Sequence, residues 1–110
     1  MGDHYLLNLY ECDPRRLNDE DFIRNTLEEA AKFADMTLIN IMSYKFTPQG
    51  VTAIALLAES HMSIHTWPEE CKAAVDVYTC GDKAKPEVAC STIKSYFLSK
   101  QSTIDHVVRL

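Results

Sequence analysis

Apolar and polar residues follow one another along the chain with two different periods, which predict strands and two helices. Apolar side chains recur at helical spacing over residues 19–34 and 86–99. Asn18 is a suitable N-cap for the first of these helices, and Pro86 suits the first turn of the second. Apolar or β-branched runs predict strands over residues 4–10, 36–46, 51–58, 72–80 and 102–110.

The connections between these segments complete the predicted fold. Residues 47–50 form a turn, a further polar strand is expected after residue 58, and Pro68 ends it and opens a helical turn. The order of elements predicts an α+β fold, a two-layer sandwich in which an antiparallel sheet carries both helices on one face. At 110 residues, the whole chain from 1 to 110 is expected to form a single domain.

Composition and charge narrow the classes of function. The chain is 46% hydrophobic and 25% charged, as in ordinary globular proteins, and no apolar run is long enough to span a membrane. The net charge of −5 and the lack of a basic patch exclude nucleic-acid binding, whereas a cationic small substrate is compatible. No signal-peptide pattern follows Met1, so the chain is expected in the cytoplasm with its four cysteines reduced.

The densest polar cluster lies in residues 59–69, directly after the apolar run 51–58. It contains three hydroxyl side chains, two imidazoles and the only tryptophan. A serine hydroxyl held against the carbonyl before it can attack that carbonyl and convert the peptide bond to an ester. Elimination of the ester then cuts the chain, and hydrolysis of the resulting dehydroalanine leaves a pyruvoyl group. Ser60, preceded by Glu59, is the serine of this cluster that could follow such a route.

Other interpretations of the same residues remain open. Ser60 could simply end a strand. His61, Ser63 and His65 share one face of an extended segment and could bind a metal together with a cysteine, although no regular pair of ligands supports this. A serine hydrolase is disfavoured, because no G-x-S-x-G turn surrounds Ser60.

The string from Glu59 to Glu69, E-S-H-M-S-I-H-T-W-P-E, resembles the central motif of the pyruvoyl-dependent S-adenosylmethionine decarboxylases of bacteria and archaea. Residues 45–51 are similar to that family's K-F-x-P-x-G-V segment, and residues 73–82 to its A-A-V-D-V-F-T-C-G-D segment. Near the start, His4 and residues 9–10, 12–14 and 17–19 also follow the family pattern. The resemblance covers residues 4 to 85.

The resemblance implies a self-cleaving proenzyme. The chain would be cut between Glu59 and Ser60 into a β chain of residues 1–59 and an α chain of residues 60–110. Ser60 would become the pyruvoyl group that forms a Schiff base with the substrate. His65 is implied as the base that takes the Cα proton of Ser60 during processing, and Thr52 stands where the family usually has a supporting serine.

The resemblance also implies how the processed enzyme works. The pyruvoyl group is generated by the chain itself, so neither PLP nor a metal is expected. Cys80 is implied as the thiol that protonates the decarboxylated substrate. Phe46, Trp67 and Glu69 are implied as substrate-binding residues, with aromatic faces that suit a sulfonium cation. The product would supply aminopropyl groups for spermidine synthesis, and the active sites are expected at the interface of a homodimer of processed αβ units.

Three departures from the family pattern keep alternatives open. Asn8 and Glu11 replace the family's Asp and Gly, and residues 70–72 (Glu-Cys-Lys) replace Tyr-Gly-Tyr. A pyruvoyl-dependent arginine or ornithine decarboxylase on the same scaffold is therefore an alternative to the S-adenosylmethionine enzyme. A homologue that stays unprocessed and only binds a ligand or a partner is another.

Overall fold

The computed structural model describes all 110 residues and is built on one six-stranded antiparallel sheet. The strands lie in the order β2-β3-β4-β5-β1-β6. Their bounds are β1 Gly2–Tyr10, β2 Leu38–Lys45, β3 Val51–Leu57, β4 Ser60–Trp67, β5 Lys72–Thr79 and β6 Gln101–Arg109. Each strand overlaps one that the sequence predicts, and the predicted α+β sandwich is confirmed.

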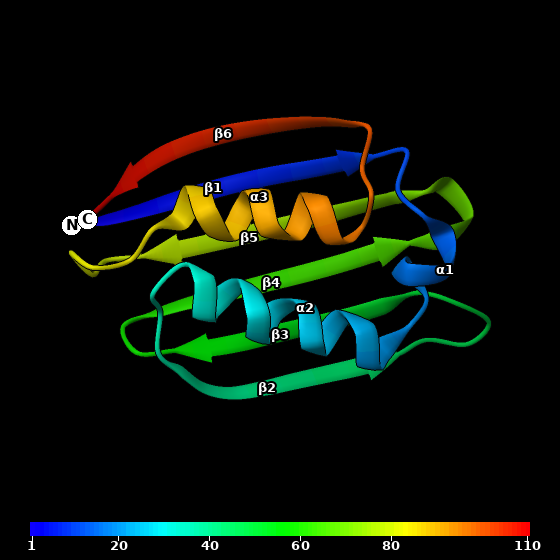
Figure 1. Ribbon diagram of the computed structural model, residues 1–110, viewed down its shortest axis with the longest axis horizontal. Coiled ribbons are helices and arrows are strands. Elements are labelled where there is room, and N and C mark those ends of the chain that lie inside the picture. Colours follow the sequence, from blue (N-terminus) through cyan, green and yellow to red (C-terminus); the bar gives the residue numbers. More distant parts are fainter.

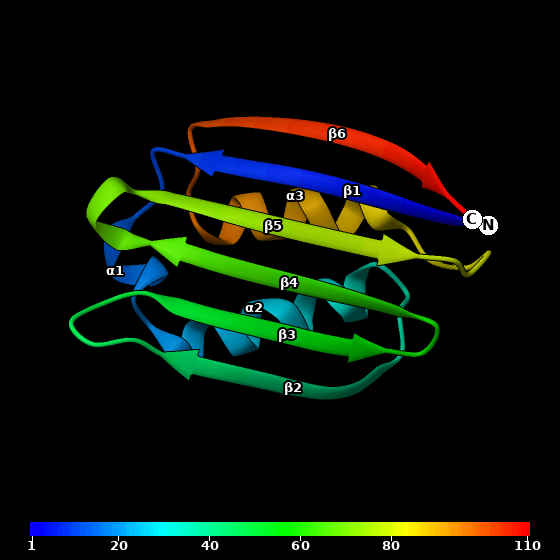
Figure 2. The same ribbon diagram turned by 180° about the vertical axis from the view of Figure 1, so that it is seen from behind.

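Both long helices lie on the same face of the sheet (Figure 1). They are α2 (Glu20–Phe33) and α3 (Pro86–Tyr96), and the buried apolar side chains form one cluster between them and the strands. The opposite face of the sheet carries no helix and is seen directly in Figure 2. We call it the open face. No helix combines the length and the apolar character needed to cross a membrane.

The start of the first long helix differs from the prediction. The N-cap of α2 is Asp19, whose side chain accepts a hydrogen bond from the backbone N–H of Phe22 at 3.0 Å. Asn18 instead ends a one-turn helix, α1 (Pro14–Leu17), which the sequence reasoning treated only as a break at Pro14. The Oδ1 atom of Asn18 accepts from the N–H of Gly50 at 2.9 Å, so it anchors the loop between β2 and β3.

Alternation along the strands decides which side chains reach the open face. In β3, Val51, Ala53, Ala55 and Leu57 are buried against the helices, whereas the residues between them are wholly or partly exposed. In β4, the open face receives His61, Ser63, His65 and Trp67. The predicted grouping of the two histidines with Ser63 on one face is therefore confirmed.

Candidate active site

The bond between Glu59 and Ser60 lies in a two-residue turn that joins β3 to β4. Leu57 pairs with Ser60 across this turn, and Glu59 has the left-handed φ of 61°. That conformation costs a residue with a β-carbon about 1–2 kcal/mol. The hydroxyl of Ser60 donates a hydrogen bond to the carbonyl oxygen of Ala58 at 3.1 Å. The turn thus holds a strained peptide bond directly beside a serine hydroxyl.

Cys80 contacts the carbonyl group of the same peptide bond. Thr79 at the end of β5 pairs with Ser60, which places the next residue, Cys80, beside Glu59. The Sγ–H group of Cys80 donates to the carbonyl oxygen of Glu59, with 2.7 Å between sulfur and oxygen. A donor on this oxygen draws electron density from the carbonyl carbon and favours attack on it.

Thr52 and His65 form a second polar pair, on the open face of β3 and β4. The two residues are directly opposite each other in the sheet, and the Oγ1 atom of Thr52 lies 3.0 Å from the Nδ1 atom of His65. Both side chains are half-buried. The contact fixes the orientation of the imidazole and leaves its Nε2 atom free of any protein hydrogen bond.

The residues predicted to bind substrate surround this second pair. Phe46, Trp67 and Glu69 line a hollow of about 350 Å³ together with Thr52 and His65. The aromatic rings are partly exposed, with 46% of Phe46 and 42% of Trp67 accessible to solvent. Packing within the chain therefore leaves both rings free to contact a ligand.

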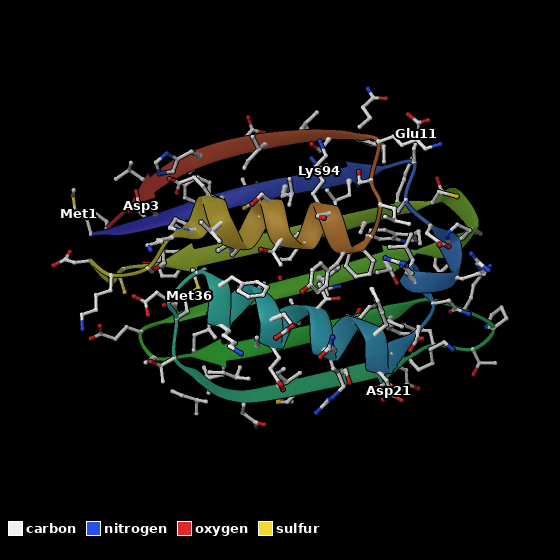
Figure 3. The ribbon with its side chains drawn as sticks, in the orientation of Figure 1. Met1, Asp3, Glu11, Asp21, Met36 and Lys94 are labelled. Atoms are coloured by element: carbon white, nitrogen blue, oxygen red, sulfur yellow. The ribbon has the colours of Figure 1, made fainter.

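The structure does not bring Ser60 and His65 together within one chain. Ser60 is the first residue of β4 and His65 is the sixth, so their Cα atoms are separated by roughly 16 Å at the usual rise of a strand. Their side chains also belong to opposite sets in the alternation of the strand. Ser60 lines a hollow of about 260 Å³ together with Met36, which marks the Ser60 end of the sheet in Figure 3. Asp21, also labelled there, lies toward the opposite end.

The open face exposes several large apolar side chains to solvent. Exposed apolar side chains extend from β2 and β3 to the strands on the other side of the sheet. They are Leu6, Met42, Tyr44, Ile54, Leu56, Trp67 and Val107. Apolar patches that extend over several strands are typical of surfaces through which proteins associate.

Two of the remaining cysteines have a structural role. Cys12 and Cys90 are buried, and burial raises the pKa of both thiols, that of Cys90 to about 11. A buried thiol with a raised pKa stays protonated and inert. Cys80, by contrast, is exposed. This difference indicates that Cys12 is a packing residue.

A row of polar side chains lies beside Ser60 on the open face, and the sequence analysis gave it no role beyond naming His61 in an alternative metal site. His61 stacks on Tyr78, with 5.5 Å between the ring centroids, and Tyr78 meets His4 edge-on. The alternation of strand residues could have placed these side chains on one face, but not in contact with each other, because β1 pairs with β5 across 72 residues of sequence.

The sequence of the chain is similar to those of known proteins. A family model described as S-adenosylmethionine decarboxylase matches residues 3–110. An S-adenosylmethionine decarboxylase proenzyme of Parasynechococcus marenigrum (strain WH8102) is 58% identical over 94 residues, which are 86% of this chain and 73% of that protein. The proenzyme of Pyrococcus abyssi (strain GE5 / Orsay) is 42% identical over 109 residues, 99% of this chain and 78% of that protein.

Two solved structures resemble the fold. The crystal structure of the adenosylmethionine decarboxylase from Aquifex aeolicus superimposes with a TM-score of 0.91 at 41% identity, covering 97% of this chain and 88% of that one. The Trypanosoma brucei AdoMetDC-delta26 monomer gives a TM-score of 0.67 at 16% identity and covers 93% of this chain and 44% of that one, which is a likeness of fold alone.

Proposed function

We propose, from the premise that the chain belongs to the S-adenosylmethionine decarboxylase family, that it cleaves itself at Ser60 and then decarboxylates S-adenosylmethionine. The observation that carries the proposal is the 2.7 Å hydrogen bond from Cys80 to the carbonyl oxygen of Glu59, beside the hydroxyl of Ser60. The decarboxylated product supplies aminopropyl groups for spermidine synthesis. We place this reaction in the cytoplasm, where the four free thiols stay reduced.

Self-cleavage begins at the strained turn. The Ser60 hydroxyl attacks the Glu59 carbonyl carbon, and the peptide bond becomes an ester between Glu59 and the Ser60 oxygen. The Cys80 thiol supports this step by donating to the carbonyl oxygen as negative charge develops there. Removal of the Ser60 Cα proton then expels the carboxylate of Glu59, and water converts the dehydroalanine to a pyruvoyl group with release of ammonia.

The base for that elimination comes from a second copy of the chain. His65 lies roughly 16 Å from Ser60 along its own strand, which is too far for proton transfer. If two open faces stack with their strands running in opposite directions, the end of β4 that carries His65 lies over Ser60 of the other copy. The exposed apolar side chains of the open face would drive this association.

The same arrangement assembles the substrate site. The hollow formed by Phe46, Trp67 and Glu69 of the partner subunit would face Ser60 and Cys80. The rings of Phe46 and Trp67 would hold the adenine and attract the sulfonium group, and the Glu69 carboxylate would bind the ribose hydroxyls or the ammonium. A single chain of 110 residues offers only shallow hollows, so two copies are needed to enclose a nucleoside.

The residues around Ser60 fit a pyruvoyl group. Ser60 is the first residue of a strand, and cleavage would free its backbone nitrogen without disturbing the pairing of β4 with β5. The pyruvoyl group supplies the carbonyl that withdraws electrons from the substrate's α-carbon as CO2 leaves, the role that PLP has in other enzymes. Cys80, whose exposed thiol contacts the Glu59 carbonyl oxygen beside Ser60, is positioned to deliver the proton to that carbon.

Mass spectrometry of the purified protein tests the proposal. Wild type should give a chain of 59 residues and a chain of 51 residues (110 minus 59), the second beginning with a pyruvoyl group. Ser60→Ala should give a single uncut chain, because no hydroxyl is left to attack the carbonyl. A wild-type chain that stays intact for days at neutral pH would contradict the proposal and favour a homologue that only binds a ligand or a partner.

A further inference from the structure

A connected row of polar side chains crosses the open face beside Ser60, and the reaction outlined above does not use it. His61 stacks on Tyr78 with 5.5 Å between centroids and 25° between ring planes. Tyr78 meets His4 edge-on at 5.9 Å, and the Nε2 atom of His4 lies 3.0 Å from Oδ1 of Asp76. The imidazole of His61 is therefore the end of a series of contacts across β4, β5 and β1.

The backbone beneath this row fixes the position of Tyr78. A β-carbon at Gly2 would collide with the tyrosine ring, so the ring lies directly over a residue that has no side chain. At the other end of the row, Ser63 donates to Oδ2 of Asp76 at 3.0 Å. Tyr78 thus provides a fixed surface against which the imidazole of His61 is oriented.

His61 and Cys80 lie on the same face and at the same end of the sheet. His61 is opposite Tyr78, and Cys80 is two residues beyond Tyr78, which makes His61 and Cys80 diagonal neighbours. Diagonal neighbours on one face of antiparallel strands are separated by about 7–8 Å between Cα atoms, within reach of an imidazole directly or through one water. Both side chains are exposed in the single chain.

Few other charged groups face His61. His4, Tyr78 and Arg109 share with it a hollow of about 300 Å³, and its neighbour on β3 is the uncharged Leu56. No carboxylate side chain lines that hollow. Cys80 is thus the group near His61 whose protonation changes during the proposed reaction.

We propose that His61 returns a proton to Cys80 after each turnover, an inference that rests on the proposed function. Decarboxylation consumes one proton, because the bond to CO2 is replaced by a bond to hydrogen. The Cys80 thiol gives that proton to the substrate carbon and becomes a thiolate. The His61 imidazolium then protonates the thiolate, and the neutral imidazole takes a proton from solvent. His61 acts through Cys80 and does not touch the substrate carbon.

The first test uses the uncut chain and so does not depend on the enzyme being active. In a Ser60→Ala background, the alkylation rate of Cys80 by iodoacetamide is measured against pH, with the modified residue identified by mass spectrometry. The thiolate is the form that is alkylated, and an adjacent imidazolium stabilises it, so adding His61→Gln should lower the rate at pH 6–7 by about tenfold. An unchanged rate profile would overturn the proposal.

The second test uses the processed enzyme. His61→Gln should cut itself as fast as wild type, lose about 100-fold in kcat, and recover activity when imidazole is added to the buffer. It should also convert more of its pyruvoyl chain to alanine per product, because an unprotonated Cys80 leaves protonation to water. His106→Gln, which changes a histidine on β6 that pairs with Asp3, is the matched control and should behave as wild type.

The outcomes separate this inference from the proposed function. If wild type never cuts, the proposed function fails, while the alkylation profile of Cys80 still reports on its coupling to His61. If wild type cuts and turns over but His61→Gln shows neither imidazole rescue nor extra alanine, the proton-return role is wrong and the proposed function stands. If His61→Gln fails to cut although it is folded, His61 belongs to processing and the inference is overturned.

Discussion

The Oγ1 atom of Thr52 and the Nδ1 atom of His65 lie 3.0 Å apart, on directly opposed residues of β3 and β4. The direction of this hydrogen bond depends on the tautomer of the imidazole. When the Nδ1–H group donates to the threonine oxygen, Nε2 carries the free lone pair and can act as a base. We propose that Thr52 holds His65 in this tautomer for proton abstraction.

Replacing Thr52 tests this relationship. Thr52→Val keeps the shape of the side chain but removes the acceptor, so the imidazole loses its preferred tautomer. Self-cleavage should slow by about tenfold, the rate equivalent of one hydrogen bond of roughly 1.4 kcal/mol. Thr52→Ser keeps the hydroxyl and should cut at least as fast as wild type. The measurement is the fraction of uncut chain against time, and equal rates for the two variants would contradict the role.

Mixing two inactive variants tests whether the site is shared between copies. Ser60→Ala has no precursor serine and should remain uncut. His65→Ala has no base and should remain uncut or stop at an ester that hydroxylamine cleaves. In a mixed dimer, His65 from the Ser60→Ala chain would serve Ser60 of the other chain. The His65→Ala chain should therefore be cut only in the mixture.

The matched control for this experiment replaces the first partner by a Ser60→Ala/His65→Ala double variant, which offers no base and should rescue nothing. Sedimentation of the wild type supplies a second check, because the cut and active species should be a dimer. A fully active monomer, or a His65→Ala chain that cuts at the normal rate alone, would contradict the shared site.

Variants of Cys80 separate its two contributions. Cys80→Ala loses the donor to the Glu59 carbonyl oxygen and should cut more slowly but at least in part, whereas Cys80→Ser retains a donor and should cut faster than Cys80→Ala. Once cut, Cys80→Ala should lose about 10²- to 10⁴-fold in turnover, as expected for a missing acid. Its chain of 51 residues (110 minus 59) should change in mass during turnover, as its N-terminal pyruvoyl group becomes alanine. Wild-type turnover with no mass shift would exclude Cys80 as the proton donor.

The buried thiol of Cys90 makes stability depend on alkaline pH. Burial raises its pKa from 9.0 to about 11 in the folded chain, so between these values the unfolded chain releases a proton that the folded chain keeps. The free energy of unfolding should therefore fall as pH rises from about 9 to about 11, by up to roughly 2 kcal/mol. Urea titrations of the Ser60→Ala chain across this range measure the fall.

Cys90→Ala should make that pH dependence shallower, whatever it does to the absolute stability. Some slope should remain, because burial also raises the pKa of Cys12. A slope unaffected by Cys90→Ala would show that this thiol does not titrate differently in the two states.

The sequence predicted the layers of the fold because local patterns determine them. The alternation in β3 and the helical spacing of α2 each specify one buried face, and these faces can be covered only by each other. The start of α2 was misplaced by one residue because Asn18 and Asp19 are both good caps. The choice depended on the contact of Asn18 with Gly50, which is 32 residues away.

The site was less predictable than the fold, because spacing along a strand does not show which side chains meet across strands. The motif placed Ser60 and His65 five residues apart, which suggested direct contact, and the extended strand separates them instead. The contact between Cys80 and Glu59 also depends on pairing between β4 and β5, which cannot be derived from either segment alone. The sequence pattern did identify that Ser60 and His65 lie in one strand, which directly follows the buried strand β3.

The placement of Ser60 and His65 at opposite ends of β4 has a kinetic consequence. A newly made chain that needs a partner's histidine cannot mature alone, so the rate of maturation in dilute conditions rises with the square of the chain concentration. Slow synthesis would leave a reserve of intact, inactive chains, and a burst of synthesis would convert that reserve quickly. The amount of working enzyme would then respond to expression with a threshold, without any separate regulator.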